Sequence, residues 1–296
     1  MARLRTVRLS RHARLDSPGA GDELRTVSAD PRDAALAVWS RRDGAGHRVV
    51  RYAPGPAQRW DVPGDLAPDF VQALPGGRLL VAEGWSRDLP DPGRQALVLD
   101  SDGTPVANGE LGNDVRHVLA DTHGAIWVGY GDEGVYGASE DERERADRIS
   151  AHGLARFDTG LRPVWGFPGD ETDPVDDCYA LTLTDRVAWS YYYSAFPITR
   201  TAKGRVTAWH TEIEGAHALL VSPTGDRACL VGNYDHPSLA TIGDLTTGTF
   251  RPRATARLTA GRHELTPERA HIVTRGPTLH AFTGPEWHAA DLSELS

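Results

Sequence analysis

The residues of this sequence that could do chemistry are acids, aromatics and one histidine, and they fall in loops. Two adjacent carboxylates, Asp132 and Glu133, stand between glycines in IWVGYGDEGVYG (126–137), and Tyr136 follows three residues after Glu133. In a strand the two carboxylates would point apart, because successive side chains alternate between faces. Only a turn would let both reach one place.

The other candidate residues fall in three further segments. Asp177 lies in GDETDPVDDC (169–178), Tyr192 and Phe196 in SYYYSAFPI (190–198), and Asn233, Asp235 and His236 in GNYDHP (232–237). Carboxylates beside a histidine suit general acid–base work, and several oxygens together suit a hard divalent cation such as calcium. The spacing matches no metal motif, so no cofactor is predicted. If a cation binds, Asp132, Asp177 and Asp235 are its expected ligands.

Composition excludes several classes of protein. The 296 residues carry a net charge of −9, with Lys203 as the only lysine, which argues against nucleic-acid binding through phosphate neutralisation. The arginine-rich N-terminus has no apolar run of seven or more residues, and no segment approaches the length of a membrane-spanning helix. We therefore expect a cytoplasmic protein without a membrane partner. Cys178 and Cys229 lie in apolar runs and are expected to be buried free thiols.

An internal repeat dominates the sequence. Six segments each contain a strand, a polar turn and a second apolar strand, and a third strand follows each of them. The repeats start near residues 25, 70, 115, 177, 217 and 262. Most intervals are therefore about 40 to 45 residues, the length of a four-stranded propeller blade.

The repeat predicts an all-β fold, a single domain over residues 1–296. We expect a six-bladed β-propeller with four antiparallel strands in each blade. Residues 1–24 would pair with the last blade and close the ring, because an open ring exposes two sheet edges. A seventh blade built partly from residues 1–24 is the alternative. The polar stretch 137–152 is predicted to be a surface insertion, and Trp39, Trp127 and Trp189 occupy matching second-strand positions that favour a core role.

One blade carries a family resemblance. The segment VLADTHGAIWVGYGDEGVYG…GLARFD, within 117–158, resembles the propeller repeat of bacterial two-component regulators. DEGVYG, DDCYALTL and YYYSAFPI together resemble a family of uncharacterised bacterial propeller proteins. The resemblance implies a propeller and no particular activity.

Blade geometry sorts the candidate residues onto one rim. In a four-stranded antiparallel blade, the loops between the second and third strands lie at the same end as the connectors between blades. All the candidate residues follow a second strand or lie in such a connector, whereas the opposite turns, such as DPRD and THGA, are short. Binding sites favour longer loops on a rigid scaffold.

The sequence therefore predicts a binding or scaffold protein that recognises a protein, a peptide or a small molecule on this rim. Acidic and aromatic loops would suit an arginine-bearing partner. The alternative is a hydrolase or lyase with a metal or carboxylate–histidine site at the mouth of the channel. No nucleophile elbow, phosphate loop or dinucleotide fingerprint supports that alternative.

Overall fold

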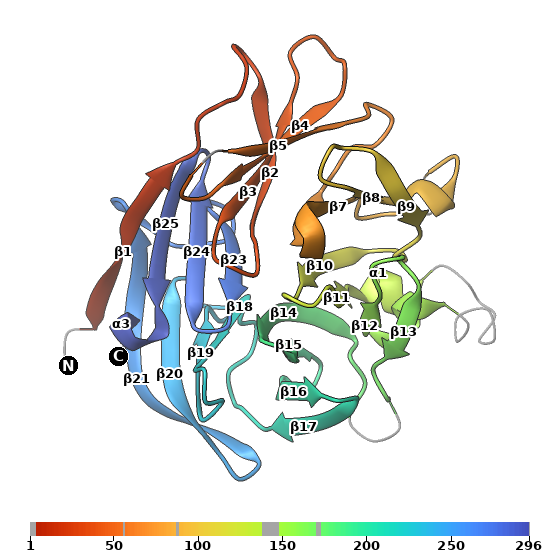
Figure 1. The fold of residues 1–296 in the computed structure, drawn as a ribbon. Helices are drawn as coiled ribbons and strands as arrows, with labels where there is room; N and C mark the ends of the chain where they lie inside the picture. Colours follow the sequence, from red (N-terminus) through yellow and green to blue (C-terminus); the bar gives the residue numbers. More distant parts are fainter. Residues whose placement is uncertain (1–3, 56, 87–88, 138–147, 170–172, 296) are drawn as a thin grey trace. The chain divides into compact units, whose positions relative to one another are not determined.

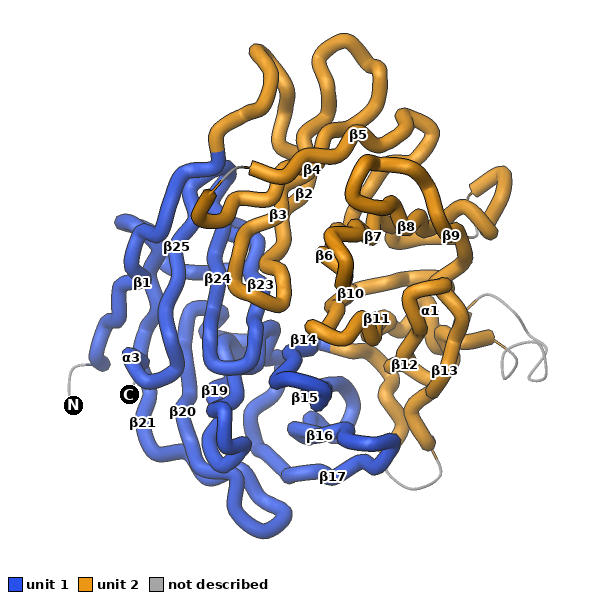
Figure 2. The backbone as a smooth tube through the Cα atoms, viewed as in Figure 1, with its two compact units in different colours: residues 1–15, 179–296 blue, residues 16–178 orange. Residues whose placement is uncertain are grey.

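The computed structural model describes residues 4–55, 57–86, 89–137, 148–169 and 173–295, and its regular structure is predominantly β-strand (Figure 1). The chain divides into two compact units (Figure 2). Unit 1 comprises residues 1–15 and 179–296, and unit 2 comprises residues 16–178. Most of the predicted insertion, 138–147, lies outside the described residues.

Unit 2 contains three four-stranded antiparallel sheets, each built from consecutive strands. The first sheet has β2 (Glu23–Ala29), β3 (Ala35–Ser40), β4 (His47–Tyr52) and β5 (Gln58–Val62); the second has β6 (Phe70–Leu74), β7 (Arg78–Ala82), β8 (Ala96–Leu99) and β9 (Pro105–Gly109); the third has β10 (Val115–Ala120), β11 (Ile126–Tyr130), β12 (Leu154–Phe157) and β13 (Pro163–Gly166). Short helices η1 (Pro75–Gly77), η2 (Pro92–Arg94), α1 (Asp132–Val135) and η3 (Ile149–His152) lie between strands.

The core of unit 2 lies between neighbouring sheets. The second strands, β3, β7 and β11, are buried almost throughout, as expected for strands covered on both faces. Apolar side chains of the first sheet pack against the second, and those of the second against the third. The outer strands β9 and β13 contain only exposed and partly buried residues instead.

A repeated aspartate shapes the tight turns of unit 2. In each case one carboxylate oxygen accepts the backbone N–H groups two and four residues further along the chain. The four aspartates are Asp30, Asp100, Asp121 and Asp158. An aspartate that bonds its own turn in this way explains why these turns need few residues.

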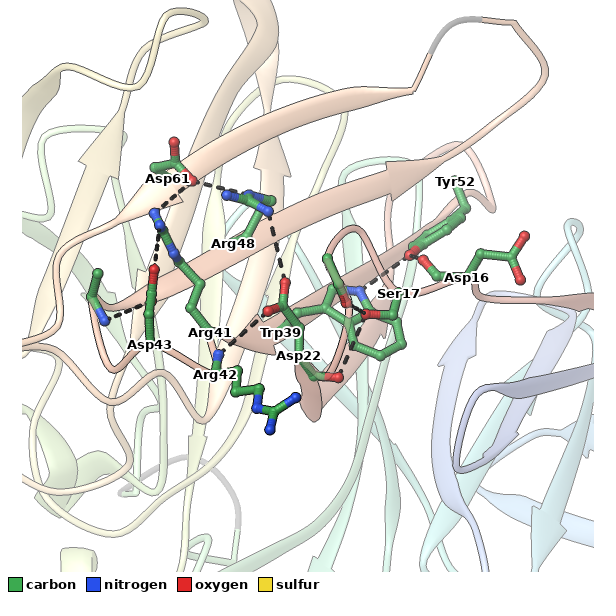
Figure 3. Close-up of polar contacts among 12 residues, drawn as sticks. Asp16, Ser17, Asp22, Trp39, Arg41, Arg42, Asp43, Arg48, Tyr52 and Asp61 are labelled. Atoms are coloured by element: carbon green, nitrogen blue, oxygen red, sulfur yellow. Dashed lines mark hydrogen bonds and ion pairs between the residues drawn. The ribbon is translucent and has the colours of Figure 1, made fainter.

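A polar network fixes the segment 16–22 onto the first sheet (Figure 3). The Tyr52 hydroxyl donates to the carbonyl of Asp16 and accepts from Trp39 Nε1 at 3.1 Å. Asp22 accepts the backbone N–H of Arg42 at 3.3 Å and lies 3.7 Å from Arg48 Nη1. Burial, the largest cause, raises the pKa of Tyr52 to about 12, so the hydroxyl keeps its proton and its role as a donor.

Unit 1 holds most of a fourth four-stranded sheet and a nine-stranded sheet. The fourth sheet has β14 (Asp177–Thr184), β15 (Val187–Tyr193), β16 (Ile198–Ala202) and β17 (Arg205–Trp209), and the first two residues of β14 belong to unit 2. The nine-stranded sheet has β18 (Ala218–Val221), β19 (Arg227–Val231), β20 (Leu239–Thr246), β21 (Thr249–Ala260), β1 (Arg5–Arg14), β25 (Glu286–Asp291), β24 (Thr278–Thr283) and β23 (His271–Arg275) in spatial order, with β22 (His263–Glu264) beside β21. The helix α3 (Leu292–Leu295) follows β25.

The N-terminal strand β1 joins two parts of this large sheet. Its first half, Arg5–Leu9, runs parallel to Ala256–Ala260 of β21. Its second half runs antiparallel to β25, where Arg11 and Arg14 both form ion pairs with Glu286. Leu9 is buried in the core of the large sheet.

Five of the six predicted repeats begin where a sheet or its part begins, at Glu23, Phe70, Val115, Asp177 and Ala218. The sixth differs. The predicted first strand at residue 262 becomes the two-residue β22, which pairs with β21, and β23 occupies the position of a first strand instead. The three repeated tryptophans are buried, and Cys178 and Cys229 are buried free thiols, which confirms those predictions.

Candidate functional site

The Asp132-Glu133 pair begins a single helical turn directly after β11. Asp132 Oδ1 accepts the backbone N–H of Glu133 at 2.9 Å, and the carbonyl of Asp132 accepts the N–H of Tyr136 at 2.8 Å. Both acids are exposed. The pair therefore lies in a turn and presents its carboxylates to solvent.

Asp114 and Arg116 lie beneath this turn: Asp114 is the residue just before β10, and Arg116 is the second residue of that strand. Arg116 Nε lies 3.0 Å from the buried carboxylate of Asp114. Glycines make the close packing possible: a Cβ on Gly131 would lie 2.2 Å from Asp114 Oδ2 and 2.4 Å from Arg116 Nε. Gly134 is equally confined, because its Cβ would lie 2.3 Å from the carbonyl oxygen of Asn113.

Asp177, at the start of β14, is the most electrostatically perturbed of the predicted residues. Its pKa is raised to about 6, first of all by burial; the Arg116 charge lowers the pKa, and the charges of Asp132 and Asp114 contribute to the rise. The pKa of Asp114 is also raised, because the effect of burial is larger than the opposing effects of the Arg116 guanidinium and the Gly134 N–H. The structure thus brings Asp132 and Asp177 into one electrostatic group with Asp114 and Arg116, which we call the acidic group.

Tyr136 follows the helical turn α1 directly, and the residue is 47% exposed. Its hydroxyl donates to Asp176 Oδ1, so that the loop after β11 is tied to the connector before β14. The neighbouring thiol of Cys178 is fully buried, and burial raises its pKa well above the usual value, which argues against a reactive cysteine here.

In unit 1, five aromatic rings form a continuous cluster around Phe196, which we call the aromatic cluster. Phe196 is 8% exposed. Its ring centroid lies between 5.5 and 6.1 Å from those of its four neighbours. The cluster comprises Tyr179, Tyr191, Tyr193, Phe196 and Tyr234.

Two rings of the aromatic cluster reach the surface. Tyr193 is 45% exposed and Tyr234 is 59% exposed. The Tyr179 and Tyr234 hydroxyls lie 3.1 Å apart, and Tyr234 covers Gly215, where a Cβ would lie 2.5 Å from the ring. The loop after β15 and the loop after β19 therefore meet through their aromatic residues.

The remaining predicted residues of unit 1 divide between surface and core. Asn233 Oδ1 accepts the backbone N–H groups of Asp235 and His236, which holds both side chains on an exposed turn. Tyr192, by contrast, is fully buried in β15, and its neighbour Tyr193 presents a ring to solvent.

The described residues contain no group of three or more histidine, cysteine, aspartate or glutamate side chains that could hold a metal ion. The set expected for calcium, Asp132, Asp177 and Asp235, is accordingly not such a group. Over the same part of the chain, no helix is both long and apolar enough to cross a membrane.

Sequence reasoning missed Asp114 and Arg116, although the signal was present. The connector GND (112–114) precedes β10, whose first two residues are Val115 and Arg116, just as the acidic connector precedes β14. The rule that assigned Asp177 to the rim therefore applies equally to Asp114.

Comparison with known proteins supports the fold. No protein-family model matches the chain, and no curated protein sequence matches it, so the resemblance to the two-component-regulator repeat has no family support. Among solved structures, Hsv2 of Kluyveromyces lactis aligns with a TM-score of 0.55 at 9% identity, over 92% of this chain and 74% of Hsv2. Hsv2 of Kluyveromyces marxianus gives 0.54 at 10% identity over 92% and 77%. AztD of Citrobacter koseri gives 0.50 at 11% identity over 90% and 68%.

These neighbours are propeller-like proteins, and together with the four-stranded sheets they support a β-propeller fold for this chain. At such low identity they show the fold alone. Function has to be argued from the residues of the site.

Proposed function

We propose that this protein is a six-bladed β-propeller that binds a partner through the loops after its second strands and the connectors between blades. The group recognised is a cation, namely an arginine or lysine side chain of a protein or peptide. The single observation that carries the proposal is the aromatic cluster, where Tyr193 and Tyr234 expose their rings against the buried Phe196.

Aromatic faces attract cations through the ring quadrupole, by about 0.5–1 kcal/mol at an exposed site. The rings of the aromatic cluster hold one another in place, so little conformational freedom is lost when a ligand arrives. Acids accompany them: Asp235 follows Tyr234, and the exposed Glu214 supplies the carbonyl that accepts the N–H of Tyr234. A negative and aromatic surface favours a positive partner.

The test is binding of a fluorescent peptide of alternating arginine and glycine, measured by anisotropy, against the matched glutamate–glycine peptide. Tyr234→Ala is expected to weaken binding by about two- to fivefold. Tyr193→Phe keeps the ring and should leave affinity unchanged, whereas Tyr193→Ala should weaken it. Val106→Ala, which shortens an exposed side chain of β9, is the control. Equal binding of both peptides, or indifference to Tyr193→Ala and Tyr234→Ala, would overturn the proposal.

An acid–base enzyme is the second candidate, and the raised pKa of Asp177 favours it. A carboxyl group with a pKa of about 6 beside the carboxylate Asp132 is suited to general acid catalysis. Hydrolysis of a panel of chromogenic esters, phosphates and glycosides, abolished by Asp177→Asn, would establish this function. Turnover that survives the substitution would exclude Asp177 as the acid.

A further inference from the structure

At the end of the unit 2 sheets opposite the loops that follow the second strands, short turns line a partly open cavity of about 150 Å³. Three first-to-second-strand turns contribute to it: Asp30–Arg32 before β3, Pro75–Gly77 before β7, and Asp121-Thr122 before β11. Residues of β4, β5, β6 and β7 complete the wall. This end carries only short connections, yet here the described residues form a concave site.

Charge around the cavity is positive. Arg32, Arg51 and Arg78 line it together with two aspartates, Asp30 and Asp121, so one positive charge remains uncompensated. Both aspartates are almost fully buried, and each uses one oxygen to accept two N–H groups of its own turn. Their role is to shape the turns.

The arginines retain donors for a ligand. Arg51 uses Nε to bind Asp30 Oδ2 at 2.6 Å, and Arg78 uses Nε to bind the carbonyl of Pro75 at 3.1 Å. Among the described residues, neither the terminal nitrogens of these two arginines nor the Arg32 guanidinium has a hydrogen-bond acceptor. A guanidinium whose Nε is anchored presents its outer nitrogens in a fixed direction, which suits bidentate binding of a carboxylate.

The floor of the cavity is apolar. Trp60 is 3% exposed and is oriented by a 3.0 Å hydrogen bond from Nε1 to the carbonyl of Asp100. Leu74 also lines the cavity. Gly76, another lining residue, has a φ of 77°, which favours glycine, and a Cβ there would meet nothing within 4 Å.

We propose that this cavity binds a small organic monoanion, a carboxylate carried on an apolar body about the size of a benzene ring. The volume matches a ligand of that size. One net positive charge is neutralised by a monoanion, whereas a dianion such as phosphate would leave an excess of negative charge beside Asp30 and Asp121. The apolar body would rest on Trp60 and Leu74.

Calorimetric titration with benzoate tests this assignment. We expect saturable binding with one site per chain. Acetate, which lacks the apolar body, and inorganic phosphate at about pH 8, which is a dianion, should bind at least about tenfold more weakly.

Two variants and a matched control locate the site. Arg32→Gln and Arg78→Gln each remove a charged donor and should weaken benzoate binding by about tenfold. Arg59→Gln removes the same charge from β5 between Gln58 and Trp60, but Arg59 does not line the cavity, and its effect should stay within about twofold. The melting temperature of each variant without ligand verifies the fold.

Absence of saturable heat from benzoate up to about 10 mM would overturn the proposal. An equal loss of affinity in Arg59→Gln and Arg32→Gln would also overturn it, because that result would show general attraction to a positive surface. Neither outcome bears on the aromatic cluster, whose peptide test is independent.

Discussion

At the scale of single residues, Asp177 is an acid placed where its ionised form is disfavoured. Its pKa is raised, mainly by burial, from 3.8 to about 6 in the folded protein. The folded state therefore binds a proton more tightly than the unfolded state, and stability falls as pH rises from about 4 through 6. Asp177→Asn removes this penalty, so we predict a higher urea midpoint than the parent at about pH 8 and equal midpoints near pH 4.

The control for this titration is Glu212→Gln, which replaces an exposed carboxylate of unit 1. Its urea midpoint should stay close to that of the parent protein at both pH values. A difference between Asp177→Asn and the parent that is the same at pH 4 and pH 8 would contradict the assignment, because packing and not ionisation would then be its source.

The sequence could place a residue where its immediate neighbours in the chain determine its environment. Asp132 and Glu133 stand between glycines, and the sequence already indicated a turn. Tyr191, Tyr192 and Tyr193 were indistinguishable in the sequence, because β15 is buried on both faces and apolarity does not reveal which ring faces solvent. Strand alternation explains the outcome: Tyr191 and Tyr193 share the face of the aromatic cluster, and Tyr192 points the other way.

At the scale of elements, a tryptophan–arginine pair recurs across the second and third strands. Trp39 faces Arg48, Trp127 faces Arg156, and Trp189 faces Arg200 in three sheets. The guanidinium carbons of Arg156 and Arg200 lie 5.6 and 5.8 Å from the ring centroids of their partners, within the range of a cation–π interaction. In the third and fourth sheets, this contact connects the second strand to the third.

A double-mutant cycle measures such a pair. Trp189→Leu and Arg200→Met should show a coupling energy of about 0.5–1 kcal/mol in urea unfolding. Each single substitution already removes the contact, so the double variant loses less stability than the sum of the two single variants. The control cycle pairs Trp189→Leu with Arg205→Met, an exposed arginine of β17 outside the contact. If the two cycles gave equal coupling energies, the tryptophan–arginine contact would contribute nothing of its own.

The boundaries of the strands were predictable in the sheets that are built from consecutive segments of the chain. A strand, a tight turn and a second strand leave their pattern within about fifteen residues, and five repeat starts followed from it. The sixth failed because the last part of the large sheet takes a strand from the far end of the chain. Since β1 pairs with β25, the sheet obtains four strands starting from β23, and β22 pairs with the extended β21 instead.

At the scale of the whole molecule, unit 1 is built from two separate segments of the chain, residues 1–15 and 179–296. Strand β1 precedes unit 2 in sequence, yet it pairs with β21 and β25 of unit 1. These pairings span more than 240 residues, as Leu9 and Ala260 show, so they form at a high entropic cost of loop closure. What holds β1 in place must therefore be specific, and buried Leu9 is the clearest candidate.

We predict that Leu9→Ala lowers the free energy of unfolding by about 2–5 kcal/mol, because Leu9 is 2% exposed within the core of the large sheet. Leu4→Ala is the matched control: Leu4 is 39% exposed just before β1, and its loss should cost less than about 0.5 kcal/mol. Arg11→Gln, which removes an exposed ion pair with Glu286, should lower the urea midpoint much less than Leu9→Ala does, because water screens the pair. Urea unfolding of the three variants distinguishes these contributions. If Leu9→Ala cost no more than Leu4→Ala, β1 would be held by its backbone hydrogen bonds, and the long-range pairing would not depend on the buried leucine.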